Sequence, residues 1–89
     1  MSHQIGERVG AISHTDENIV YLYGFGIYDG EHIPPKDAGG FNVGRPNPRI
    51  KLDNGKTVYG CECWWGAEEQ VKAQINGMEI VFVDGHDEN

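Results

Sequence analysis

Hydrophobic and polar positions alternate with a period of two in five runs of this chain, which is the pattern of half-buried β-strands. Such runs cover residues 6–12, 19–28, 50–53, 56–65 and 78–83. Residues 67–76 follow a helical pattern instead, because Ala67, Val71 and Ile75 recur every four residues. Two glutamates open this segment and Gly77 follows it, as at the two ends of a helix. The pattern predicts five strands and one helix.

The strongest turn signal is Asn54-Gly55, which lies between two alternating runs and predicts a hairpin with a two-residue type I′ turn. Such a turn places Leu52 opposite Thr57 and Ile50 opposite Tyr59. One face would then be the core face, and the opposite face would carry Val58 and the exposed Trp64. The core face predicted in this way consists of Ile50, Leu52, Thr57, Tyr59, Cys61, Cys63 and Trp65.

Glycines and prolines predict how the strands are connected. Gly24 and Gly26 interrupt the most β-prone run, 19–28, and indicate a bend, a bulge or a close backbone approach. Residues 31–48 contain Pro34-Pro35 and several glycines, so we expect a long irregular loop. The order strand, strand, long loop, strand, strand, helix, strand predicts a mainly β fold with one helix, a small five-stranded antiparallel barrel of the Src-homology-3-like type. An α+β roll is the alternative.

The length of 89 residues predicts a single domain, 1–84, followed by an acidic tail, 85–89. No apolar run approaches the length of a membrane span and the first residues carry no hydrophobic segment, so we expect a cytoplasmic protein that does not contact membranes. The net charge of -7 opposes direct binding to nucleic acid. Within residues 36–56, however, five basic residues against two acidic ones give +3 and leave -10 for the remainder.

This basic window and its surroundings hold the candidate binding residues. An aromatic residue among glycines in a loop either fills the core or meets a partner, and arginines beside exposed amides can hold an anion. An outward tryptophan is a recognition platform or a cover for the junction of helix and sheet. The structural alternatives are a flexible loop and a solvated hairpin edge. The candidates are Phe41, Arg45, Arg49, Lys51 and Trp64.

Cys61 and Cys63 could chelate a soft metal, with His3, His14, His32 or His86 completing the ligand set. The spacing differs from the paired knuckles of zinc sites, and free cysteines on a core face commonly act as small buried hydrophobes. We therefore expect no cofactor. The chain also lacks any catalytic motif or paired-carboxylate spacing, which favours a protein that is not an enzyme.

The run NPRIKLDNGKTVYGCECWWG at 47–66, with GERVG at 6–10, resembles small uncharacterised proteins encoded by bacteriophages and prophages. The resemblance implies that the chain binds a host or defence component. The sequence thus predicts a non-enzymatic, phage-type accessory module whose partner is a protein or a small anionic ligand.

Three alternatives remain. The first is an acidic inhibitor that mimics nucleic acid through Glu62, Glu68, Glu69 and Glu79. The second is a zinc-binding module that uses the two cysteines. The third is a homo-oligomer that shares sheet edges, because the second strand is apolar on both faces.

Overall fold

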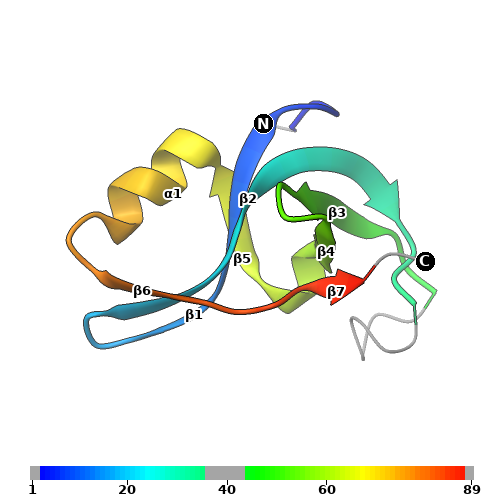
Figure 1. Ribbon diagram of the computed structural model, residues 1–89. Helices are drawn as coiled ribbons and strands as arrows, with labels where there is room; N and C mark the ends of the chain where they lie inside the picture. Colours follow the sequence, from blue (N-terminus) through cyan, green and yellow to red (C-terminus); the bar gives the residue numbers. More distant parts are fainter. Residues whose placement is uncertain (1–2, 36–43, 88–89) are drawn as a thin grey trace.

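The computed structural model describes residues 3–35 and 44–87, and within them it is mainly β with one helix (Figure 1). The predicted fold class, a small barrel-like β domain with a single helix, is confirmed. The elements in chain order are β1 (Arg8–Asp16), β2 (Ile19–His32), β3 (Asn47–Leu52), β4 (Lys56–Tyr59), the 3-10 turn η2 (Gly60–Glu62), β5 (Trp64–Ala67), α1 (Glu68–Ile75), β6 (Glu79–Phe82) and β7 (His86–Asp87).

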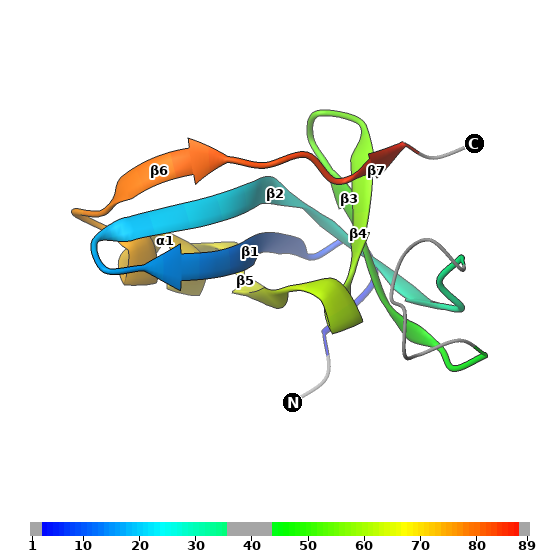
Figure 2. The same cartoon turned by 90° about the horizontal axis from the view of Figure 1, so that it is seen from below.

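The long strand β2 organises the sheet, whose order is β5-β1-β2-β3-β4-β7. One edge of β2 pairs with β1, and the other edge pairs with two strands in succession. Residues 19–22 pair in parallel with β6, and the pairing with β3 begins at Gly26 and is antiparallel. Figure 2 shows β6 and the β3–β4 hairpin following one another along β2. The parallel β6 ladder is the one departure from the predicted antiparallel pairing within the described chain.

Each face of the sheet has its own hydrophobic cluster. On the α1 side, Val71 and Ile75 of the helix pack over Ile12, Val20 and Leu22. On the opposite side, the curved sheet closes over a second cluster formed by Val9, Ala11, Tyr28, Ile50, Leu52 and Val58. The predicted helix is confirmed with its apolar stripe inward, and Gly77 adopts the left-handed conformation expected after a helix end.

The predicted register of the hairpin is wrong by one residue. Ile50 pairs with Val58, and Lys51 pairs with Thr57, so the loop has three residues and Gly55 alone takes a positive φ. The amide of Gly55 donates to the carbonyl of Leu52 at 3.0 Å. This register gives Val58 a core position facing Ile50, so the burial of one more aliphatic side chain outweighs the local preference of Asn-Gly for a type I′ turn.

The two glycines of β2 lie at a bulge and at a close backbone approach, two of the features that their positions predicted. Gly24 has a φ of +131° and lies where the β1–β2 register shifts, so it forms a bulge. The bulge brings Phe25 to the same face as Leu22, whereas strict alternation placed these two residues on opposite faces. A Cβ on Gly26 would lie 2.0 Å from the carbonyl oxygen of Lys51, which is the close approach of β2 to β3.

Three segment boundaries differ from the predictions. The strand predicted over 56–65 is interrupted at Gly60 by η2, and β5 starts anew at Trp64. Both ends of the predicted loop 31–48 belong to strands, since β2 continues to His32 and β3 begins at Asn47. In the predicted tail, His86 and Asp87 pair with β4. This pairing uses the backbone and needs no apolar side chain, which is why hydropathy did not reveal it.

Candidate functional site

The structure places the predicted binding residues on different elements. Phe41 lies outside the described residues. Arg49 on β3 donates to the carboxylate of Asp29 on β2, through Nε at 2.8 Å, and both side chains are largely covered. The arginine holds the pKa of Asp29 below its ordinary value, so the pair is ionised at neutral pH. Arg49 therefore links β3 to β2 where the register between these two strands shifts, after Tyr28.

Arg45 and Lys51 lie at the surface on either side of Arg49. Arg45 precedes β3, where its carbonyl oxygen accepts a hydrogen bond from the side-chain amide of Asn47 at 3.1 Å. Lys51 is exposed on β3, opposite Thr57. The strand order separates these residues from Trp64 on β5 by two intervening strands. Arg45, Arg49 and Lys51 thus belong to the β3 region and Trp64 to the β5 edge of the sheet.

Trp64 and Trp65 lie on opposite faces of β5, as the period-two pattern predicted. Trp65 stacks on Tyr28 with ring centroids 5.4 Å apart and packs against the core cluster. Trp64 is 48% exposed and lies on the helix side. A Cβ on Gly66 would be 3.7 Å from its ring and 3.8 Å from the amide oxygen of Gln70 on α1. The indole thus covers the junction of helix and sheet with one part and meets solvent with the other.

The two cysteines do not share one strand face, because η2 turns the chain between them. Cys63 packs against the core cluster, and burial raises the pKa of its thiol to about 12. Its Sγ donates to the carbonyl of Tyr59 at 3.4 Å. Cys61 is half-buried. Within residues 3–35 and 44–87, no group of three or more His, Cys, Asp or Glu side chains is arranged to hold a metal ion.

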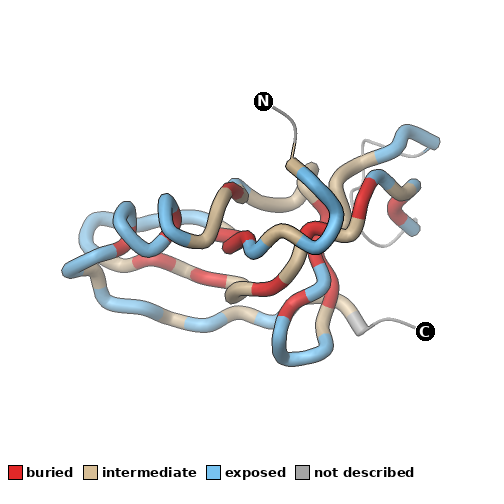
Figure 3. Tube along the Cα trace, turned by 90° about the horizontal axis from the view of Figure 1, so that it is seen from above, coloured by how far each residue is buried: buried red, intermediate tan, exposed pale blue. Residues whose placement is uncertain are grey.

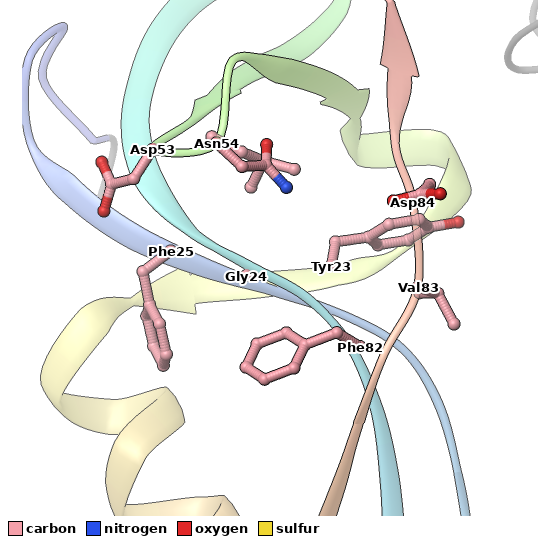
Figure 4. Close-up of a pocket in the computed structure, with 9 residues that line it drawn as sticks. Tyr23, Gly24, Phe25, Asp53, Asn54, Phe82, Val83 and Asp84 are labelled. Atoms are coloured by element: carbon pink, nitrogen blue, oxygen red, sulfur yellow. The ribbon is translucent and has the colours of Figure 1, made fainter.

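A pocket of about 280 Å³ lies where the edge of β2 passes from β6 to β3. The β6 ladder ends at Leu22 and the β3 ladder begins at Gly26, so the segment between them faces a gap in the sheet. The β3–β4 turn closes one end of the gap and the chain leaving β6 closes the other (Figure 4). We call this pocket the notch; its lining residues are Tyr23, Gly24, Phe25, Leu52, Asp53, Asn54, Phe82, Val83 and Asp84.

The notch combines aromatic walls with an acidic rim. The rings of Tyr23, Phe25 and Phe82 surround it, and Asp53 and Asp84 lie at its two ends in Figure 4. Arg8 binds Asp53 through two hydrogen bonds of 2.8 and 2.7 Å and thereby holds the pKa of that carboxyl below its ordinary value. Burial raises the pKa of the Tyr23 phenol, so this side chain remains neutral. The notch is therefore apolar within, with the Arg8-bound carboxylate of Asp53 at one end and the carboxylate of Asp84 at the other.

Beside the notch, β6 presents two large apolar side chains to solvent. Phe82 is 71% exposed and Ile80 is 42% exposed. Their register opposite Leu22 and Val20 places them on the helix side of the sheet, beyond the strands that α1 contacts. Figure 3 shows the chain through β6 as mostly exposed, next to a β2 that alternates between buried and half-buried residues. We call Ile80 and Phe82 the β6 apolar pair.

Sequence reasoning located this strand but did not select it as a site. Residues 78–83 are apolar at most positions, which is equally typical of a central strand and of an exposed edge. What makes the notch is the bulge at Gly24 and the choice of β2 as the partner of β6, and neither depends on local pattern. One sequence feature could have drawn attention to this site: the strongly apolar run 78–83 is followed directly by the acidic segment 84–89.

Comparison of the chain with protein-family models, with curated proteins and with solved structures gives no match. The assignment of function therefore depends on the geometry described above. None of the helices in the described part of the chain has both the length and the apolar character required to cross a membrane.

Proposed function

We propose that this protein is a non-enzymatic binding module, a phage-type accessory protein that binds a host or defence protein through the β6 apolar pair and the notch. The observation that carries the proposal is the exposure of Phe82, an aromatic side chain on an edge strand and at the mouth of a pocket. Aromatic residues are enriched in the centres of protein interfaces, where a partner covers them and removes their surface from water.

A protein partner is favoured over the small anionic ligand. Arg8 binds the carboxylate of Asp53 at one end of the notch, and the carboxylate of Asp84 at the other end opposes an anion. Its volume of about 280 Å³ is just below the range of roughly 300–1,000 Å³ that is usual for small-molecule sites. A pocket of this size accommodates a side chain of a partner protein.

The acidic-mimic alternative loses part of its basis in the structure. Glu62 accepts a hydrogen bond from the amide of Tyr59 and contacts His86. Glu68 accepts hydrogen bonds from Arg8 and is paired with Lys72. Two of the four carboxylates assigned to the mimic are thus engaged within the molecule. Trp64, which projects on the same side of the sheet from the opposite edge, stays a second candidate contact.

The test is affinity capture from host-cell lysate with three forms of the full chain: wild type, Phe82→Ser and Ile5→Ser. Ile5 is the matched control, because it is 73% exposed and lies away from the notch. We expect one captured protein that is retained by wild type and by Ile5→Ser and lost by Phe82→Ser. Urea unfolding of the three forms checks that the loss does not come from unfolding. Equal capture by Phe82→Ser would remove the β6 surface from consideration.

A further inference from the structure

The outer edge of β6 is an unpaired row of backbone groups. The amides of Glu79 and Val83 donate to Asn18 and Leu22 of the β2 segment, at 2.9 and 3.0 Å. Because successive residues of a strand direct their backbone groups to opposite edges, the amide and carbonyl groups of Ile80 and Phe82 point away from β2. No described residue pairs with that edge, and Figure 2 shows β6 at the margin of the sheet. Such an edge accepts an additional strand.

The chemistry of the notch selects one kind of side chain. Aromatic walls favour an aliphatic stem, and both aromatic faces and carboxylates favour a cation. Asp53 is already bound by Arg8, but Asp84 makes no hydrogen bond or ion pair with the described residues. A lysine or arginine side chain satisfies all of these conditions, with its stem against Phe82 and its charged group beside Asp84.

We infer, building on the function proposed above, that the partner supplies an extended segment that pairs with the outer edge of β6 and inserts a lysine or arginine into the notch. A second copy of this chain does not meet the requirement. The segment it would offer, EIVFVDG at 79–85, contains two acids and no basic residue. The partner segment is therefore an apolar strand that carries a basic residue, complementary to a chain whose net charge is -7.

The experiment is a selection of displayed 12-residue random peptides on the immobilised full-length protein, with Phe82→Ser used to remove peptides that bind elsewhere. The selected peptide is then synthesised with each basic residue replaced in turn by a neutral counterpart, citrulline for arginine and norleucine for lysine. Its affinity is measured by fluorescence anisotropy for wild type, for Asp84→Asn and for Glu69→Gln. Glu69, exposed on α1, is the control for the same change in net charge.

We expect peptides with alternating apolar residues and at least one basic residue. The neutral replacement at one position and Asp84→Asn should each weaken binding about fivefold, and the two together should add little more, because one ion pair is lost in either case. Glu69→Gln should leave the affinity within about twofold.

Three results would overturn the inference. Selected peptides without a basic residue, still lost by Phe82→Ser, would refute the cation site and leave the proposed function standing. Selection of no peptide, or of peptides whose binding survives Phe82→Ser, would refute both. A concentration-dependent dimer in light scattering that Phe82→Ser abolishes would show that a second copy occupies this edge.

Discussion

Strands β3 and β6 pair with the same edge of β2 and have a similar alternation of apolar residues. The apolar side chains of β3 are buried, whereas those of β6 are exposed. β3 reads RIKL at its end and β6 reads EIVF, so each places two large apolar side chains on one face. Ile50 and Leu52 of β3 are 0% and 5% exposed, whereas Ile80 and Phe82 of β6 are 42% and 71% exposed. The alternating pattern is alike in both strands, but the curved sheet covers only the first pair.

The difference shows which strand contributes to the core of this small domain and which strand leaves apolar side chains exposed. The β3 ladder is antiparallel, and an ion pair from Arg49 to Asp29 reinforces it. The β6 ladder is parallel and has four register pairs. A strand that contributes little to the core can be covered by another molecule at small cost, and this is the property that the proposed function requires.

The largest expected effect comes from breaking the junction of β2 with β3. Gly26→Ala places a Cβ 2.0 Å from a backbone oxygen of β3, so the two strands must separate. We expect a loss of about 3 kcal/mol or more in the free energy of unfolding, measured by urea denaturation. Gly66→Ala is the control, since its nearest neighbours would lie at 3.7 and 3.8 Å. An equal loss in both variants would contradict the close approach.

The second prediction compares the two strands directly. Ile50→Ala removes a fully buried side chain and should cost about 2–5 kcal/mol of unfolding free energy. Ile80→Ala truncates a side chain that stays partly in solvent and should cost less than about 1 kcal/mol. Urea titration of both variants under the same conditions measures the contrast. Similar costs would mean that β6 is covered in solution.

The third prediction concerns pH. The pKa of Asp29 is lowered by its bond to Arg49, so this pair stabilises the fold above the unfolded carboxyl value of about 3.9 and ceases to do so as pH falls through the lower folded value. Arg49→Met should therefore destabilise the protein by about 1 kcal/mol at pH 7 and by much less near pH 2. Lys72→Met, which removes an exposed ion pair, is the control and should have a smaller effect at pH 7.

A contradiction would be a destabilisation by Arg49→Met that is the same at both pH values, because the loss would then come from packing. Asp53 and Glu68 also have lowered pKa values through Arg8, so the wild-type protein as a whole should lose stability in the same acidic range.

The smallest effect, and the sharpest test of the open edge, is in hydrogen exchange. The amides of Glu79 and Val83 bond to the β2 segment and should exchange slowly, whereas those of Ile80 and Phe82 point outward and should exchange faster. Amide exchange followed by nuclear magnetic resonance resolves the four positions. Slow exchange at Ile80 and Phe82 in the isolated protein would indicate that another strand already covers the edge.

Part of this structure follows from local sequence. The helix was predicted from spacing and its end glycine, the bulge and close approach from Gly24 and Gly26, and the opposite orientation of Trp64 and Trp65 from strand alternation. These features depend on the conformational limits of single residues and on period, which act within a few positions.

The tertiary structure decided the rest. The hairpin register followed from the space that the core offers Val58, and the strand at His86 and Asp87 from a backbone edge that β4 supplied. Arg49 changed from a binding candidate to an internal link because Asp29, twenty positions away, lies opposite it. The exposure of Ile80 and Phe82 likewise depends on which strand β6 joins and on what packs over it. Burial depends on elements distant in the chain, so a local pattern can show that a side chain is apolar but not whether it is covered.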